Sequence, residues 1–303
     1  MENNAATAFE HLLPGLGPDA TALFVHAHPD DETIVTGATM AAAAAAGARV
    51  VLVTCTRGEL GEVIPPELAH LEVKAADLAA GIHDAGHTGS AAAADGTGLA
   101  EERERELAAA LHALGVSEHI WLGQGLTAPA GGPVVFRDSG MAWGADGRAT
   151  AASTVLPGSF SKAPLAQEAD LLAAAIRTLQ PAVVVTYAAD GGYGHPDHVR
   201  AHELTMAALR AAATPSQDAP GWVVPAIYAI VSDRPESALE AGVQRLAVRG
   251  DLAAKTAAMQ AHRTQITVAG ERFALSDDVW RDITAVEEFI AVDPASIYEV
   301  QAP

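Results

Sequence analysis

One stretch near the start of the chain decides the fold: "ALFVHAHPDDETIVTG", residues 22–37. It opens with a continuous apolar run, which is typical of a buried β-strand. The run leads into two histidines, a proline and three consecutive acids, ending at Glu32. Ligand and active sites of open α/β sheets form where strands end. So many proton acceptors directly after a buried strand therefore predict a functional site at its carboxyl end.

Strand-like and helix-like segments alternate along the first two thirds of the chain. The strands are short, rich in β-branched residues and mostly without polar alternation, as in strands covered on both faces. The helical segments between them are rich in Ala and Leu. This order predicts an α/β protein with a Rossmann-like, mostly parallel sheet and helices on both faces. We expect strands at 22–28, 49–56, 118–123 and 182–188, and helices at 36–46, 100–114 and 165–179.

A second motif rich in histidine and acid follows another predicted strand. It reads "ADGGYGHPDHVRAHE", residues 189–203, and it repeats the His-Pro-Asp of the first motif and adds His198. Because strand ends of a parallel sheet lie at one edge, the two motifs should meet there. Catalytic zinc commonly takes three imidazole or carboxylate ligands and keeps one position open. His28, Asp31 and His198 make such a set.

The other polar residues of the two motifs are candidates for acid–base roles. Water bound at a metal needs a nearby base, and Asp30 stands next to a predicted ligand. His195 and Asp197 form a pair that could carry a proton or stabilise an oxyanion. Each residue has a structural alternative, because Asp30 could simply cap a helix and a histidine at a helix start can be a surface residue. Two such motifs at equivalent strand ends favour the metal site.

The composition argues against two classes of partner. The chain of 303 residues has 18 Lys and Arg against 38 Asp and Glu, a net charge of −20 that repels phosphate backbones and anionic lipids.

The first residues lack the basic and apolar regions of a secretory signal. Gly47 and Arg49 interrupt the apolar stretch 37–55, which we interpret as helix, turn and strand. With a single cysteine, Cys55, expected to be buried, these features predict a cytoplasmic protein that binds neither nucleic acid nor membrane.

The remaining segments are less regular. We expect a mobile loop at 79–98, which is polar and Gly-rich, and a functional or disordered loop from 125 to 160. The pattern changes again in the last quarter of the chain, which could form a small mixed subdomain or extend the sheet. We therefore predict a Rossmann-like catalytic domain at 20–215 and a C-terminal subdomain or sheet extension at 216–303 that closes the pocket.

Both motifs resemble those of the LmbE/PIG-L family of zinc N-deacetylases; here they read "HAHPDDETIVTGATMA" and "GGYGHPDHV". Within that family the chain is most similar to the actinobacterial deacetylases of mycothiol biosynthesis, which remove acetyl from N-acetylglucosaminyl-inositol. The similarity runs from about Leu23 to Val199, and residues 253–265 resemble a late helix of the same enzymes. The resemblance implies a zinc-dependent hydrolase acting on this small glycosyl-inositol. The same ligands also suit Fe(II).

The resemblance also implies roles for single residues. Zinc would be bound by His28, Asp31 and His198, with Asp30 as the general base. The catalytic residues would further include His195, which stabilises the transition state and protonates the leaving amine, Asp197, which tunes the histidines, and Tyr193 at the oxyanion. The family's substrate contacts map to Glu62, Arg103, Asp138 and Met141. From the sequence alone, Arg103 in "EERERE" would be part of a solvated helix face.

Four other functions fit parts of the pattern. A Rossmann-type nucleotide binder shares the fold class, but acids stand where a glycine-rich phosphate loop would be needed. A non-catalytic sugar-binding relative should lack the base or a ligand, and all are present. Mycothiol S-conjugate amidases and other N-acetyl-sugar deacetylases of the family remain alternatives. The resemblance implies a Lys after the first motif and a Pro before the second in the amidase, where this chain has "ETIVTG" and Gly194.

Overall fold

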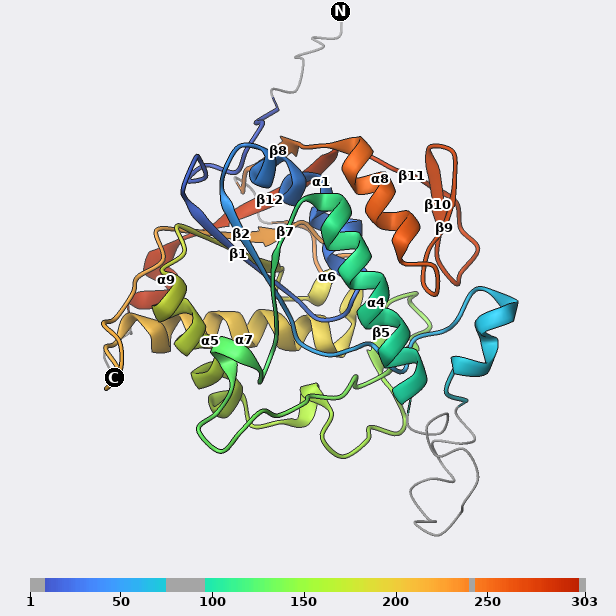
Figure 1. Ribbon diagram of the computed structural model, residues 1–303, viewed down its shortest axis with the longest axis horizontal. Helices are drawn as coiled ribbons and strands as arrows, with labels where there is room; N and C mark the ends of the chain where they lie inside the picture. The colour runs from blue at the N-terminus through green and yellow to red at the C-terminus, as the bar shows by residue number, and fades with distance from the viewer. Residues whose placement is uncertain (1–8, 75–95, 240–242, 300–303) are drawn as a thin grey trace, which may run out of the picture.

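The computed structural model describes residues 9–74, 96–239 and 243–299. Its main sheet consists of β1 (Thr21–His26), β2 (Arg49–Thr54), β3 (Glu118–Trp121), β6 (Val183–Tyr187), β7 (Ala226–Ile230), β8 (Arg245–Arg249) and β12 (Val286–Val292). The strand order is β3-β2-β1-β6-β7-β12-β8 (Figure 1). The first five strands in this order are parallel, and β12 is antiparallel to both of its neighbours. The predicted α/β class and mostly parallel sheet are confirmed.

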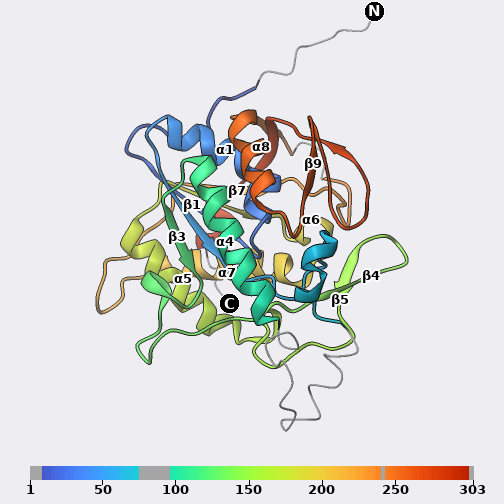
Figure 2. The same cartoon turned by 45° about the vertical axis from the view of Figure 1, so that its right-hand side comes forward.

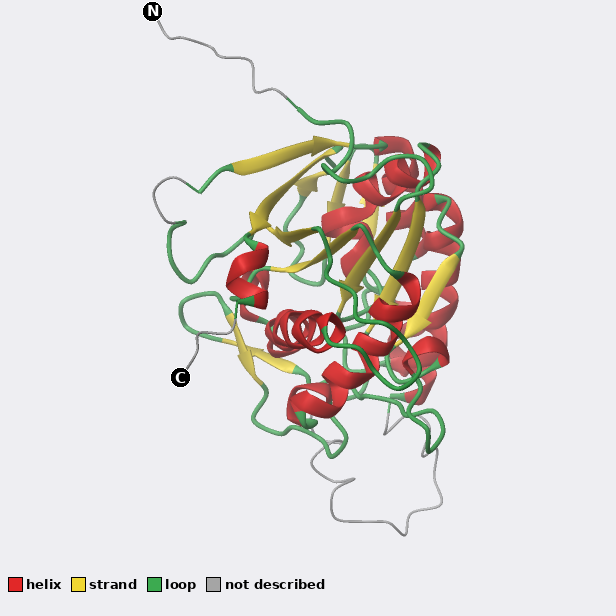
Figure 3. Ribbon diagram, turned by 90° about the vertical axis from the view of Figure 1, so that its left-hand side faces the viewer, coloured by secondary structure: helices red, strands yellow, loops and turns green. Residues whose placement is uncertain are grey.

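The helices form two groups, one on each face of the sheet (Figures 1 and 3). One group packs together from α1 (Asp31–Ala45), α4 (Thr97–Leu114) and α8 (Leu252–Ala261), and the other from α5 (Leu165–Leu179), α7 (Pro196–Ala213) and α9 (Pro294–Tyr298). Shorter turns are α6 (Gly191–Gly194) and the 3₁₀ segments Pro66–Leu71, Gly125–Thr127 and Phe160–Lys162. This double covering explains the continuous apolar strands, because both faces of each strand must be buried.

The core lies along the central strands. Leu23, Phe24 and Leu52 are fully buried, and Cys55 is buried as predicted. Within the described ranges every helix is too short or too polar to cross a membrane. The stretch 37–55 is the end of α1, a turn and β2, as expected from Gly47 and Arg49.

Several boundaries differ from those predicted. α1 begins at Asp31 and not at Thr36, and β1 ends at His26, so that His28 follows the strand. Acidic residues stabilise the first turn of a helix, which is why the acids of the motif belong to α1. The loop expected at 125–160 contains a small antiparallel hairpin of β4 (Met141–Trp143) and β5 (Ala149–Ala151). The predicted mobile loop at 79–98 lies outside the described residues except for 96–98, where α4 begins.

The C-terminal part both extends the main sheet and forms a second one. β7, β12 and β8 continue the main sheet beyond β6, while β9 (Thr267–Ala269), β10 (Arg272–Ala274) and β11 (Arg281–Asp282) form an antiparallel sheet beside α8 (Figure 2). The main sheet is thus continuous across residue 215. A division into two domains at that residue stays a prediction.

A close backbone contact joins α1 to the C-terminal strands. Asp251 N donates to the Ala38 carbonyl at 3.0 Å, and a Cβ on Gly250 would lie 2.0 Å from that same oxygen. Glu287 of β12 accepts from the backbone N–H groups of Ala38 and Thr39 at 3.0 and 2.8 Å. Position 250 therefore has no room for a side chain while α1 keeps this contact.

We expect the substitution Gly250→Ala to destabilise the protein, because its methyl group would push α1 away from the connection between β8 and α8. Overpacking of this kind typically costs about 1–3 kcal/mol, and here the obstacle is backbone, which cannot rotate away. Thermal unfolding should show a clear fall in Tm. The matched control is Gly131→Ala, where a Cβ would meet nothing within 4 Å and the Tm should stay close to that of the wild type. Equal Tm values for both variants would contradict the packing argument.

Candidate metal centre and active site

The two His-Pro-Asp motifs meet because their strands are parallel neighbours. Ala22 of β1 stands opposite Val183 of β6, so both strands end at the same edge. There the Asp31 carboxylate lies between two imidazoles: its Oδ2 is 3.2 Å from His28 Nδ1, and its Oδ1 is 3.2 Å from His198 Nε2. All three side chains are largely buried. The structure thus brings the three predicted ligands together.

The hydrogen bonding of His198 suits a metal ligand. Its Nδ1 lies 3.2 Å from the Gly191 carbonyl, to which it can donate. The other nitrogen, Nε2, faces the Asp31 carboxylate and would carry the lone pair when an ion is bound there. Among the described residues this buried nitrogen has no hydrogen-bond partner. A backbone carbonyl that fixes the imidazole tautomer is the usual outer partner of a metal-binding histidine, so the donor set fits a divalent cation.

Acids surround His28 on its other side. Its Nε2 lies 3.2 Å from Asp197 Oδ2 and 3.8 Å from Asp138 Oδ1. Burial lowers the pKa of His28, but Asp138, Asp197 and Asp31 outweigh it and hold that pKa well above its usual value. Burial raises the pKa of Asp31, yet His198 and His28 hold it well below its usual value. Asp31 is therefore ionised, as a carboxylate ligand must be.

His195 is held in a defined tautomer. It is the N-cap of α7, and its Nδ1 accepts from Asp197 N at 3.1 Å, so that the proton sits on Nε2. Burial and the nearby His28 and His198 hold the pKa of His195 well below its usual value. The ring is thus a neutral donor within the site. Its ligand atoms also lie within 4.8 Å of those of His28 and His198, and the same holds for the group His28, Asp138 and Asp197.

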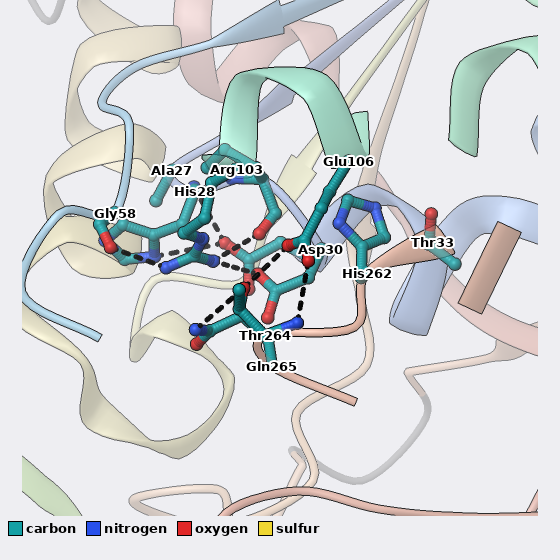
Figure 4. A network of polar contacts seen from close by, with 12 residues as sticks. Ala27, His28, Asp30, Thr33, Gly58, Arg103, Glu106, His262, Thr264 and Gln265 are labelled. Carbon is teal, nitrogen blue, oxygen red and sulfur yellow. Dashed lines mark hydrogen bonds and ion pairs between the residues drawn. The ribbon is translucent and has the colours of Figure 1, made fainter. Parts of the chain in front are cut away.

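Asp30 occupies an unusual backbone conformation beside the predicted ligands. It is the N-cap of α1 with φ 115° and makes no capping bond with its own side chain. Instead, its Oδ1 accepts from Arg103 Nη2 at 2.8 Å (Figure 4). Burial raises the pKa of Asp30 to about 6; Arg103 opposes this shift, and Asp31 adds to it. A carboxyl group with such a pKa suits a general base that works near neutrality.

A cavity of about 350 Å³ opens over these groups, within the range of small-molecule sites. The C-terminal part lines it with Gln265, Phe273 and Leu275, among others. The Asp197 side chain lies behind the wall, and its Oδ2 accepts from Ser139 N at 2.9 Å. The other predicted site residues all line the cavity: His28, Asp30, Asp31, Glu62, Arg103, Asp138, Met141, Tyr193, His195 and His198.

Most of the chain also matches known protein sequences. A model of the PIG-L family, described as GlcNAc-PI de-N-acetylase, matches residues 23–209. The chain belongs to the PIG-L family. A 1D-myo-inositol 2-acetamido-2-deoxy-alpha-D-glucopyranoside deacetylase from Thermobifida fusca is 42% identical over 300 residues, which covers 89% of this chain and 92% of that protein. A protein of the same name from Kineococcus radiotolerans is 44% identical, with 81% and 69% covered.

Solved structures share the fold of this PIG-L protein. An N,N'-diacetylchitobiose deacetylase from Pyrococcus horikoshii superposes with a TM-score of 0.52 at 19% identity, covering 81% of this chain and 70% of that one. A 4-carboxy-2-hydroxymuconate hydratase from Pseudomonas putida gives 0.51 at 19% identity, with 91% and 97% covered. One is a deacetylase and the other a hydratase, so the fold alone does not decide the reaction.

The hydrogen bonds of Arg103 are not those expected of a side chain that is free to bind substrate. Its Nη1 donates to the Gly58 carbonyl at 2.7 Å, and its Nη2 donates to the Pro29 carbonyl and to Asp30. The side chain is buried and not part of a solvated helix face. It lines the cavity, but the donors named here are already bound, Nη1 to the loop after β2 and Nη2 to the loop of the first motif. A direct contact between Arg103 and substrate stays a prediction.

Sequence reasoning missed the buried polar residues behind Asp30. Glu32 and His262 form a fully buried pair with 2.9 Å between Oε1 and Nε2. Glu106 accepts from both the N–H and the hydroxyl of Thr264, at 2.7 and 2.6 Å (Figure 4). One signal was available: residues 253–265 resemble a late helix of the family, and His262 and Thr264 lie within that segment. The pairing itself could not be inferred, because Glu32 and His262 stand far apart in the sequence.

We expect His28→Ala to abolish metal binding, because it removes one of the three predicted ligands and leaves Asp31 without one of its imidazole partners. Metal per chain should be measured by elemental analysis of protein purified without chelator. His119→Ala is the matched control: His119 lies on β3, with its Nε2 3.0 Å from Thr54 Oγ1 and away from the cavity. It should keep the metal content of the wild type. Full metal content in His28→Ala would show that the ion binds elsewhere.

Proposed function

We propose that this PIG-L protein is a metal-dependent N-deacetylase that removes acetyl from N-acetylglucosaminyl-myo-inositol, a step of mycothiol biosynthesis. One observation carries the proposal: a complete ligand-and-base set at the ends of β1 and β6 lies in a chain that is 42% identical, over 89% of its length, to a protein named for this deacetylation. The cavity accepts a small molecule. Neither nucleic acid nor a membrane is needed as a partner.

The proposed ion is zinc, with Fe(II) as the alternative, because two imidazoles and one carboxylate suit both. His28, Asp31 and His198 would hold it. When bound there, a divalent ion would polarise the amide carbonyl and lower the pKa of a coordinated water to about 7, far below that of bulk water. The ionised Asp31 and the lone pair on His198 Nε2 support this assignment.

The chain's own groups then move the protons. Asp30 takes a proton from the attacking water as the oxygen bonds to the acetyl carbon. The neutral His195, with its proton on Nε2, donates to the oxygen that becomes negative, and removal of one such donor typically costs about 10²–10³ in rate. The C–N bond breaks as its nitrogen takes up the proton that Asp30 removed from the water, and the products are the free amine and acetic acid, which ionises to acetate.

Tyr193 is the second proposed donor to the oxyanion. Burial, together with Asp31 and other acids nearby, holds the pKa of its phenol well above its usual value, so the hydroxyl keeps its proton. Its ring lies 5.1 Å from that of His198 and 5.9 Å from that of Trp143, measured between centroids. Asp197 would orient His28 and, through its backbone N–H, His195.

The sugar and inositol would bind in the outer cavity. Glu62, Arg103, Asp138 and Met141 are the proposed contacts, in agreement with their place in its wall. Asp138 is held in position, because its Oδ1 accepts from Gly140 N at 2.8 Å. Fixed polar groups of this kind suit a neutral ligand covered in hydroxyls.

Gly194 favours deacetylation over cleavage of a mycothiol conjugate. In the amidases we expect a proline at this position, but Gly194 has φ +94°, and a Cβ would lie 2.7 Å from the Ala149 carbonyl. Proline fixes φ near −65°, so it cannot adopt this conformation. In an amidase, the loop before His195 would therefore have to follow a different path. Because this loop forms part of the cavity wall, the shape of the cavity would differ as well.

We predict that Asp30→Asn keeps the metal of the wild type while kcat for acetate release falls by at least about 10², the usual scale for loss of a general base. Asparagine has nearly the same shape but cannot take the proton. Metal content and kcat should be measured on the same preparation. A variant that is inactive and has also lost its metal would mean that Asp30 is a ligand.

Substrate choice is tested by comparing kcat/KM on three compounds. We expect the largest value for N-acetylglucosaminyl-inositol, a smaller one for a mycothiol S-conjugate and a poor one for free N-acetylglucosamine. A pocket built to hydrogen-bond the inositol loses those bonds on burial when the inositol is missing. Preference for the conjugate would make the protein an amidase. A kcat/KM for free N-acetylglucosamine equal to that for N-acetylglucosaminyl-inositol would indicate a broader sugar deacetylase.

A further inference from the structure

The backbone of Asp30 needs external support. Its φ of 115° lies outside the regions that L-residues ordinarily adopt, and such conformations persist only where the surroundings hold them. Two contacts do so: Arg103 Nη2 binds the carboxylate at 2.8 Å, and the Asp30 N–H donates to Glu32 Oε2 at 2.9 Å. One fixes the side chain and the other fixes the peptide. The direction in which the Asp30 carboxylate points depends on both contacts.

Glu32 is itself held by a residue from the other end of the chain. It is fully buried in the first turn of α1, and its Oε1 accepts from Thr33 Oγ1 at 2.6 Å and from His262 Nε2 at 2.9 Å. His262 is also fully buried, and among the described residues its Nδ1 has no hydrogen-bond partner. The polar contact of this imidazole is thus directed to Glu32.

α4 positions both Arg103 and the loop that begins at His262. Arg103 and Glu106 stand one turn apart on this helix, and Glu106 accepts twice from Thr264, two residues after His262 (Figure 4). The same helix therefore holds the Asp30 carboxylate directly and carries the loop whose histidine holds Glu32. The two supports of Asp30 are mechanically linked.

We propose that His262 is a positioning residue for the general base: through Glu32 it fixes the peptide of Asp30 and thereby aims the Asp30 carboxylate at the attacking water. His262 does not line the cavity and so does not touch substrate. The proposal rests on the proposed function, in which Asp30 is the base. It predicts an effect on the chemical step and not on substrate binding.

A second buried pair provides an internal comparison. Lys255 Nζ lies 2.7 Å from Glu287 Oε1, both side chains are 3% exposed, and Glu287 accepts from the backbone of Ala38 and Thr39 in the middle of α1. This pair also joins α1 to the C-terminal part, but it does not touch Asp30. Loss of either pair should loosen the same helix, whereas only loss of the His262 pair should disturb the base.

The test compares His262→Leu, His262→Gln and Glu287→Gln, each loaded with metal. In His262→Leu we expect kcat to fall about 10–100-fold, the scale of a base misplaced by about 1 Å, with KM within about twofold and metal content unchanged. His262→Gln should recover most of the kcat, because its amide nitrogen reaches the position of Nε2. Glu287→Gln should lower Tm but keep the wild-type kcat.

Three results would overturn the proposal: a wild-type kcat in His262→Leu, the same loss of kcat in Glu287→Gln, or no recovery in a folded His262→Gln. If His262→Leu does not fold, Glu32→Gln carries the test, because one amide oxygen must replace two carboxylate oxygens, and kcat should again fall at unchanged KM. An unchanged kcat in that variant contradicts the proposal.

A second measurement does not depend on the substrate. In a crystal structure of His262→Leu we expect Asp30 to have left its positive φ and its contact with Arg103, whereas Glu287→Gln should keep both. An unchanged Asp30 in His262→Leu would refute the positioning role even if activity is lost. Conversely, a wild-type protein that releases no acetate from N-acetylglucosaminyl-inositol refutes the proposed function, while the comparison of the two crystal structures still decides whether His262 positions Asp30.

Discussion

The parallel pairing of β1 with β6 is the constraint on which the site depends. These strands are separated by more than 150 residues of sequence, yet their register places the loops after them side by side. The three predicted ligands, Asp30 and His195 are all attached close to one of the two strand ends. α1 and α7 start directly behind these loops, so their first turns fix the orientation of Asp31 and His198. A shift in this pairing would separate the predicted ligands without changing any of these residues.

The second constraint is the pairing of buried charge. Carboxylates are costly to bury without a partner, and this site gathers several of them in a protein of net charge −20. Each is matched by a positive or hydrogen-bonding group: Asp31 by His28 and His198, Asp30 by Arg103, Glu32 by His262, and Asp197 by His28 and Ser139 N. Groups held in this way need little rearrangement when charge develops, which is the basis of electrostatic preorganisation.

Sequence patterns were sufficient for the elements and for the groups nearest the chemistry. The strands β1, β2, β3 and β6 and the helix 165–179 were predicted because apolar runs and helical periodicity are local signals. The start of α1 was not, because the acids of the motif interrupt the apolar pattern. The order β7-β12-β8 and the pair of Glu32 with His262 could not be predicted either, since both depend on contacts between segments far apart in the chain. A sequence motif indicates which side chains lie close together in the fold, but not which other residues hold them in place.

The C-terminal part combines two tasks in adjoining segments. His262 contacts Glu32 and Thr264 contacts α4, whereas the small sheet region that follows, β9 to β11, contributes Phe273 and Leu275 to the wall of the cavity. Because these segments are separate, evolution can exchange the wall without touching the support of the base. A small sheet grafted from a relative after residue 265 would thus alter which acyl sugar fits, while the inherited catalytic apparatus stays intact. The same graft begun before residue 262 would have to bring its own partner for Glu32.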